Sequence, residues 1–221
     1  MPRSAAAEPP TTTPPLSGRR AEAARNDGVI LRAAREVFLD DPSAPIAAVA
    51  ERAGVGIGAL YRRYPSKDAL LQRLCGDGLQ AYTDEAERSL ADDTDPWAAF
   101  AGFLARVVDI GAASLTRRLA GTFTPTPELY AAAARAGELN VEIVRRAHDA
   151  GVLRQDVTVN DLGLIFEQLA SISIGAADRD RKLRQRYLAL LLDAMRTPPG
   201  HEPLPVPPPT DRELQRRWQR R

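Results

Sequence analysis

The sequence predicts an all-α protein, and three observations support this prediction. Apolar residues recur at helical spacing in almost every segment between residues 19 and 196. Capping and helix-stopping residues separate these segments from one another. The only β-like patch, residues 157–159, is too short to count as a strand. The 221 residues are enough to bury a core without a disulfide or a metal.

The two ends of the chain differ from its centre. Residues 1–18 contain five prolines and residues 198–210 contain seven, so neither segment is expected to fold. The predicted organisation therefore has four parts: a disordered arm at 1–18, a first helical domain at 19–75, a second at 76–196, and a proline-rich linker with a basic tail at 197–221. Leu214 and Trp218 could form a short amphipathic helix that docks on the body or touches DNA, but a mobile tail is the favoured interpretation.

The first domain should contain three helices and the start of a fourth. Asn26 is expected to cap a helix that ends near residue 40. A short second helix over 46–53 should end at Gly54, and a third over about 57–64 should end before Pro65.

The second domain begins within the long fourth helix, for which Ser66 is the expected cap. Four further helices are expected, each with its own start signal: one from Asp95-Pro96, one from Thr126-Pro127 to about 149, one over 162–175 after a Thr158/Asp161 capping box, and one over about 178–195.

The segment from 46 to 67 has the spacing of a helix-turn-helix, with two short helices separated by Gly54-Val55-Gly56. A small Ala50 allows the helices to cross closely, and Leu60 can fill the crossing. Gly54 suits the positive φ of a helix stop. A plain helical hairpin that packs for stability alone fits this spacing equally well.

The continuation from Leu60 to Leu71, LYRRYPSKDALL, separates these alternatives because it resembles the TetR family of transcription regulators. The resemblance covers about residues 26–74. It implies a homodimer with a three-helix DNA-binding domain, and a larger helical domain that binds a small-molecule effector.

The resemblance also implies which residues meet double-stranded DNA. Base-facing positions fall on Ile57, Gly58, Ala59 and Arg62, and phosphate-contacting positions on Tyr61, Arg63 and Lys67. Arg62 is the best candidate for a bidentate contact with guanine. Gly56 and Ala59 stand where the family often has hydroxyl residues, so DNA shape should carry more of the specificity. Arg19 and Arg20 could reach DNA as a flexible arm, but two solvated charges are the favoured interpretation.

An effector pocket would have to form among the middle helices. The candidate lining residues are Tyr82, Phe100, Phe103, Val107, Phe123, Tyr130 and Phe166. Ordinary core packing is the favoured interpretation for each of them. By analogy with the family, the helices over 162–174 and 187–192 form the dimer face, with a buried intramolecular core as an equal alternative.

Composition excludes several other functions. The net charge is +1, but residues 19–75 carry ten basic and seven acidic side chains while residues 76–195 carry 13 and 18. Cys75 is the single cysteine and the two histidines lie far apart, so we expect no metal, no cofactor and no enzyme. Apolar runs are too short to span a membrane, and residues 1–16 lack a signal-peptide core, so a cytoplasmic protein is expected.

The sequence therefore predicts a sequence-specific DNA-binding regulator, a repressor that a small-molecule effector releases from a palindromic operator. The alternative is a helical ligand-binding or interaction module that has lost specific DNA binding. An enzyme that uses the central pocket is a further rival, but catalytic groups for it are not found.

Overall fold

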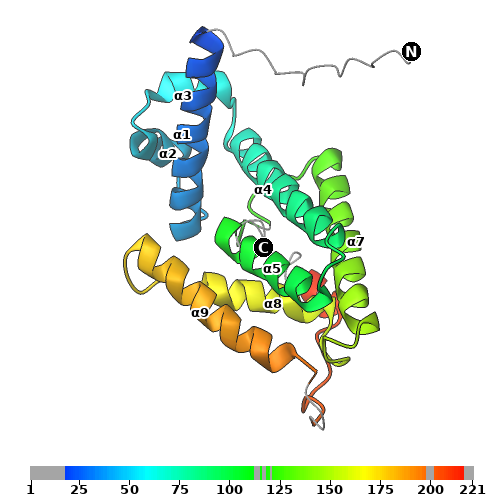
Figure 1. Cartoon of the computed structure of the whole chain (residues 1–221). Coiled ribbons are helices and arrows are strands. Elements are labelled where there is room, and N and C mark those ends of the chain that lie inside the picture. The colour runs from blue at the N-terminus through cyan, green and yellow to red at the C-terminus, as the bar shows by residue number, and fades with distance from the viewer. Residues whose placement is uncertain (1–17, 112–114, 116–117, 120, 198–201, 217–221) are drawn as a thin grey trace, which may run out of the picture.

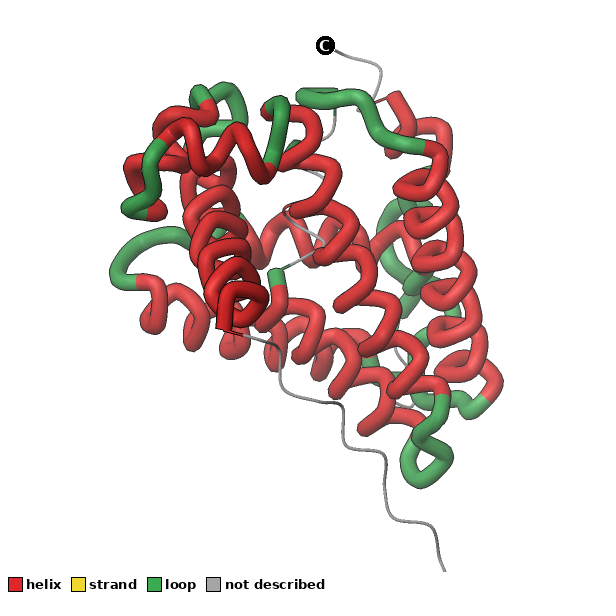
Figure 2. Tube along the Cα trace, turned by 90° about the horizontal axis from the view of Figure 1, so that it is seen from above, coloured by secondary structure: helices red, strands yellow, loops and turns green. Residues whose placement is uncertain are grey.

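The computed structural model describes residues 18–111, 115, 118–119, 121–197 and 202–216, with the backbone alone at 18–24 and 215. This part of the chain forms helices and loops, and its one β contact is an isolated bridge between Leu153 and Arg196 (Figure 2). The all-α prediction is confirmed. The helices are α1 (Gly18–Asp40), α2 (Ile46–Ala53), α3 (Ile57–Arg63), α4 (Lys67–Leu90), α5 (Pro96–Ile110), α7 (Pro127–Asp149), α8 (Val159–Ala170), α9 (Ala177–Met195) and α10 (Asp211–Arg216).

The helices form two groups joined by one long helix (Figure 1). We call α1–α3 the head, and α5 with α7–α10 the body. The helix α4 begins beside the head and runs into the body, packing against both α5 and α7. The predicted domain boundary, between residues 75 and 76, lies within α4. One continuous helix therefore connects the head to the body.

Most helix ends lie where their capping residues predict them. Gly54 ends α2 with a φ of 66°. The Ser66 hydroxyl accepts a hydrogen bond from the Ala69 amide at 3.0 Å, and Asp95 accepts from two amides at the start of α5. The Thr158 amide donates to the Asp161 carboxylate at 2.7 Å, which completes the predicted capping box.

The start of α1 is a correction to the sequence prediction. The helix begins by Gly18, so Asn26 lies inside it and does not cap it. The residues between Gly18 and Asn26, which include Arg19 and Arg20, are mostly Ala, Glu and Arg. These residue types favour helix strongly enough to extend it. The two arginines therefore belong to a helix and do not form a flexible arm.

The end of α8 is a second correction, because the helix stops at Ala170 and not near residue 175. The cause lies in α9, where the buried Asp180 carboxylate accepts hydrogen bonds from the amides of Ile174 and Gly175, both at 3.0 Å. These amides are satisfied outside a helix, which fixes the loop between α8 and α9.

The C-terminal segment also differs from expectation over its described residues. Asp156 accepts a hydrogen bond from the Leu204 amide at 2.8 Å, and Arg154 donates to the Glu202 carbonyl at 3.0 Å. The Asn160 amide donates to the Pro209 carbonyl at 2.9 Å, just before α10. Side chains of the body thus hold the proline-rich segment, which cannot form its own backbone ladder. Trp218 of the predicted amphipathic tail lies outside the described residues.

Two apolar cores stabilise the molecule. The head core contains Phe38, Val49 and Leu60 together with Leu71 and Cys75 from α4, and each of these side chains is fully buried. The body core gathers the buried aromatic side chains of α5 and α8 around α4 and α7. Because α4 contributes side chains to both cores, a change in the position of the head relative to the body requires a shift of α4 or of the contacts beside it.

Candidate DNA interface and ligand cavity

The turn between α2 and α3 is built by backbone geometry and one buried leucine. The left-handed Gly54 reverses the chain, and the Val55 amide donates to the Ala50 carbonyl at 3.0 Å. A side chain at position 54 would be strained at this φ. Leu60 has no exposed surface and packs where the two helices meet, as the helix-turn-helix spacing predicts.

The outer face of α3 brings the predicted base-facing residues together. Ile57, Gly58, Ala59 and Arg62 are all exposed, and α3 lies at the outer side of the head (Figure 1). Among the described residues, Arg62 has no hydrogen bond and no ion pair. Its guanidinium is therefore available for an acceptor on another molecule.

Tyr61 and Arg63, two of the predicted phosphate contacts, also lie on exposed positions of α3. Arg63, however, already forms an ion pair inside the protein. Arg63 donates to both carboxylate oxygens of Asp27 on α1, at 2.9 and 3.1 Å. The Tyr64 hydroxyl donates to the same carboxylate at 2.5 Å. This arrangement fastens the end of α3 to α1.

The electrostatics of Asp27 follow from these partners. Its side chain is 10% exposed, yet the hydrogen bond from Arg63 holds the pKa of its carboxyl below the usual value, against the opposing effect of burial. Burial and the bond to Asp27 raise the pKa of the Tyr64 hydroxyl, which therefore stays protonated. Sequence reasoning did not find Asp27, because it lies 36 residues before Arg63 and no local pattern links the two.

Lys67 lies at the first position of α4 and is half-buried. Its ammonium donates to the carbonyls of Pro42 and Ala44 at 3.0 and 2.8 Å, and lies 5.0 Å from the centre of the Phe38 ring. An ammonium has three N–H donors, so two are used to hold the loop before α2. A phosphate contact by Lys67, which stays a prediction, would depend on the remaining donor.

The predicted effector residues separate into two sets. Tyr82, Phe100, Phe103, Val107 and Phe166 lie together in the body core and are at most 6% exposed. Phe123 instead packs beside the head core, and Tyr130 is 63% exposed on α7.

The five core residues belong to one apolar cluster. The rings of Tyr82 and Phe103 meet edge to face with their centres 5.5 Å apart. The Tyr82 hydroxyl donates to Asn140 at 2.6 Å. These contacts are typical of core packing, and a ligand-binding role for the five residues stays a prediction.

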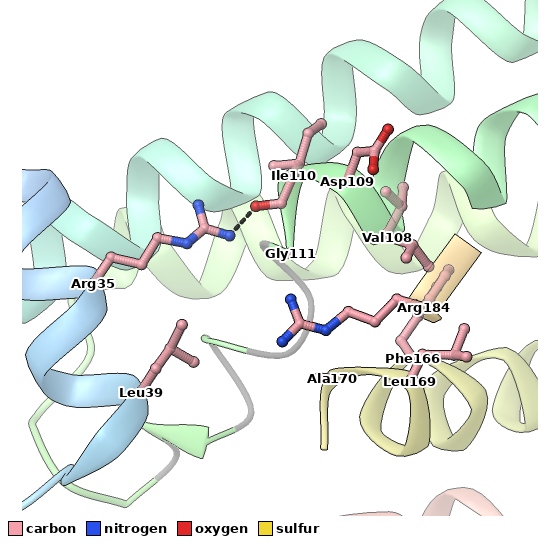
Figure 3. Close-up of a pocket in the computed structure, with 11 residues that line it drawn as sticks. Arg35, Leu39, Val108, Asp109, Ile110, Gly111, Phe166, Leu169, Ala170 and Arg184 are labelled. Carbon is pink, nitrogen blue, oxygen red and sulfur yellow. Dashed lines mark hydrogen bonds between the residues drawn. The ribbon is translucent and has the colours of Figure 1, made fainter. Parts of the chain in front are cut away.

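A cavity of about 260 Å³ lies where α1 meets the body, between α1, α5, α8 and α9 (Figure 3). We call it the joint cavity. Of the predicted effector residues, only Val107 and Phe166 line it. The other lining residues are Arg35, Leu39, Val108, Asp109, Ile110, Gly111, Leu169, Ala170 and Arg184.

Sequence reasoning did not find the arginines of the joint cavity. Arg35 lies on α1 and Arg184 on α9, so only the tertiary fold brings them to one place. Each also resembles an ordinary surface charge in the sequence pattern. No group of three or more His, Cys, Asp or Glu that could hold a metal occurs within the described part of the chain. Nor is any of its helices both long and apolar enough to cross a membrane.

Comparisons with known proteins agree with this geometry. Residues 30–74 match the family model described as bacterial regulatory proteins, tetR family. Residues 95–197 match the model described as transcriptional regulator SbtR-like, C-terminal domain. The two models together cover more than half of the chain. No curated protein sequence matches it significantly.

Solved structures with the same fold include three bacterial regulators. A TetR regulator from Mycobacterium vanbaalenii is 28% identical, with a TM-score of 0.52 over 81% of this chain and 99% of that one. SCO0520 from Streptomyces coelicolor is 25% identical, with a TM-score of 0.51 over 77% and 98%. LfrR from Mycobacterium smegmatis, solved with proflavine, is 22% identical, with a TM-score of 0.56 over 82% and 99%, and shows the fold alone.

Proposed function

Because this chain belongs to the TetR family of transcriptional regulators, we propose that it is a repressor that leaves a palindromic operator when a small effector binds. Its helix-turn-helix makes it a DNA-binding regulator. The observation that carries the proposal is the exposed face of α3, where Arg62 has no partner among the described residues. Regulators of this family are generally not enzymes, and we propose no catalytic step.

The α3 helix suits a DNA groove in both size and chemistry. Seven residues span about 10 Å, and a B-DNA major groove is about 12 Å wide. Gly58 and Ala59 keep the start of the helix narrow, so the backbone can approach the bases closely. Arg62 follows one turn later and can donate to guanine O6 and N7.

The proposed homodimer forms through α8 and α9. Ile174, Tyr187 and Leu190 are 79%, 49% and 57% exposed, on α9 and the loop before it. Exposed large apolar side chains favour contact with another protein surface. A second copy would give two α3 helices for two half-sites, about 34–36 Å apart or somewhat more.

Effector release is proposed to work by population shift. An effector that binds one arrangement of head and body better than another moves the dimer toward that arrangement. The two α3 helices then no longer match successive major grooves. Equal operator affinities with and without a true effector would contradict this mechanism.

Selection from random DNA duplexes tests the proposal. The full chain is incubated with the pool near physiological salt, and bound duplexes are amplified and sequenced over several rounds. Recovery of one palindrome is the expected result. Enrichment of no motif, with binding that disappears as salt rises, would indicate phosphate contacts alone.

That second result would favour the alternative function, a ligand-binding or interaction module without specific DNA binding. One structural observation supports this alternative. Lys67 and Arg63, two of the three predicted phosphate contacts, already have partners inside the protein. Acting on DNA, the regulator is proposed to work in the cytoplasm.

A further inference from the structure

We infer that the joint cavity binds a small organic acid, whose anionic group lies between Arg35 of α1 and Arg184 of α9. This inference rests on the proposed function, because it names the chemical class of the effector and the place where it acts. Figure 3 shows the two guanidinium groups entering the cavity region from opposite sides.

Arg184 leaves a hydrogen-bond donor unused. One of its terminal amines donates to the Ile172 carbonyl at 2.9 Å. Its Nε is buried and has no hydrogen-bond partner among the described residues. Buried donors are almost always paired in native structures, so an unpaired one requires an explanation. A carboxylate oxygen supplied by a ligand would accept this hydrogen bond.

Arg35 adds a second positive charge to the same space. Its one hydrogen bond to a described residue goes to the Ile110 carbonyl, so four of its five N–H donors have no partner among the described residues. Burial lowers the pKa of the Arg35 guanidinium, and the like charge of Arg184 lowers it further. Two cations that share a buried space favour an anion between them.

The protein itself supplies little opposing charge. Asp109 is the one acidic residue among the described residues that line the cavity, and it is exposed. Its carboxylate points away from the space between the two guanidinium groups (Figure 3). The undescribed residues between 112 and 120 contain no Asp or Glu in the sequence. An external anion is therefore the matching partner.

The remaining lining defines the rest of the ligand. Leu39, Val107, Val108, Phe166 and Leu169 form an apolar wall. The volume of about 260 Å³ is slightly smaller than that of sites for drug-sized molecules. An inorganic anion would leave the wall without contact, whereas a short-chain or aromatic acid would fill both parts.

The position of the joint cavity links binding to DNA. Arg35 and Leu39 belong to the head, and the other lining residues belong to the body. An acid held by both arginines would tie α1 to α9. Since α1 packs against α2 and α4, the tie would change the angle at which α3 meets its groove.

A purely structural role for the arginines makes opposite predictions. Arg35 bonds the last carbonyl of α5, and Arg184 bonds a carbonyl just beyond α8, as cations at helix C-termini do. If this were their whole role, removal of either would lower the thermal midpoint and no acid would bind between them.

The test follows the thermal unfolding of the full chain without DNA. Benzoate and hexanoate are the probes, benzamide and hexanamide are their neutral counterparts, and sodium chloride matches the ionic strength. The variants are Arg184→Met and Arg35→Met, each of which removes one cation from the cavity. Arg186→Met is the control, because it removes an exposed charge from the same helix.

At least one acid should raise the midpoint of the wild type and of Arg186→Met saturably, by roughly 3–6 °C at ten times its dissociation constant. The matching amide should not. Both cavity variants should lose this response, and Arg184→Met without ligand should unfold no earlier than the wild type.

The inference is overturned if neither acid stabilises the wild type beyond its amide, or if the cavity variants respond as the wild type does. A lower ligand-free midpoint of Arg184→Met with an unchanged response to acid would assign the arginine to structure alone. Because DNA is absent, failure here leaves the operator proposal intact. If the duplex selection fails, the acid response can still be measured, because that experiment contains no DNA.

Discussion

Two exposed faces of this molecule, one on α3 and one on α9, differ in chemistry more than in exposure. Ile57 and Tyr61 on α3 are 43% and 48% exposed, while Tyr187 and Leu190 on α9 are 49% and 57% exposed. The α3 face carries Arg62, a cation without a partner among the described residues. The α9 face exposes Tyr187 and Leu190 beside the charged Arg186. Exposure alone therefore does not identify a partner, whereas an unpaired cation favours a nucleic acid and an apolar edge favours a second protein.

The largest expected effect concerns Leu60, which supports the α3 face from below. Leu60→Ala removes a fully buried side chain, so it should lower the free energy of unfolding by about 2–5 kcal/mol and abolish operator binding. Chemical denaturation measures the stability. The control is Tyr61→Ala on the exposed side, which should change stability by less than about 0.5 kcal/mol. Equal losses in both variants would show that α3 is not anchored by Leu60.

The next effect concerns the α9 face. Tyr187→Asp with Leu190→Asp should weaken the dimer on the order of a hundredfold, since charges would be buried without partners in the interface. Analytical ultracentrifugation measures the dissociation constant. Tyr130→Asp with Val141→Asp on α7 is the matched control, because these residues are also large, apolar and exposed. A dimer that survives the α9 change but not the α7 change would move the interface to α7.

A smaller effect separates base contacts from phosphate contacts on the head. Arg62→Ala should weaken operator binding by about 1–3 kcal/mol and relax the preference at one base position. Lys67→Ala should weaken all sequences alike, and by less, because two of its donors already bond to carbonyls. Binding titrations against operator and scrambled duplexes at several salt concentrations measure both. If Lys67→Ala changes specificity more than Arg62→Ala, the proposed docking of α3 is wrong.

The smallest effect concerns the link between α1 and α3. Asp27→Asn should lower stability by about 1–2 kcal/mol near neutral pH, because Arg63 and Tyr64 lose a charged partner. Glu36→Gln is the control, since its ion pair with Arg52 is more than half-exposed on both sides and contributes less.

The pH dependence of this effect has a defined sign. The folded pKa of Asp27 lies below the ordinary value of 3.8, so its stabilisation is complete above that value. It is lost as the pH falls through the folded pKa. The stability difference between wild type and Asp27→Asn should therefore be constant from pH 7 to about 5 and shrink below about 4. A difference that grows in acid would contradict the assignment.

The sequence predicted features that depend on neighbouring residues. Gly54, Ser66 and Asp95 mark helix ends through bonds within a few residues, so spacing alone located them. The burial of Leu60 at the crossing of α2 and α3 followed from the helix-turn-helix spacing in the same way. The all-α class depends on such local signals.

Features that depend on distant residues were not predictable. The early end of α8 depends on Asp180 in the next helix, and the Asp27–Arg63 pair joins helices 36 residues apart. The joint cavity brings together Arg35 and Arg184 from opposite ends of the described chain. Of the residues predicted to line a pocket, Val107 and Phe166 do line the joint cavity, whereas Tyr82, Phe100 and Phe103 pack elsewhere in the body core.

The buried position of Cys75 provides a practical means of observing the head separately from the body. It is the single thiol of the chain and has no exposed surface in the folded head core. A thiol-reactive reagent can therefore modify the protein only as fast as that core opens. The modification rate therefore reports local opening of the head core. Comparing this rate with and without operator or acid would show whether either partner suppresses that local opening.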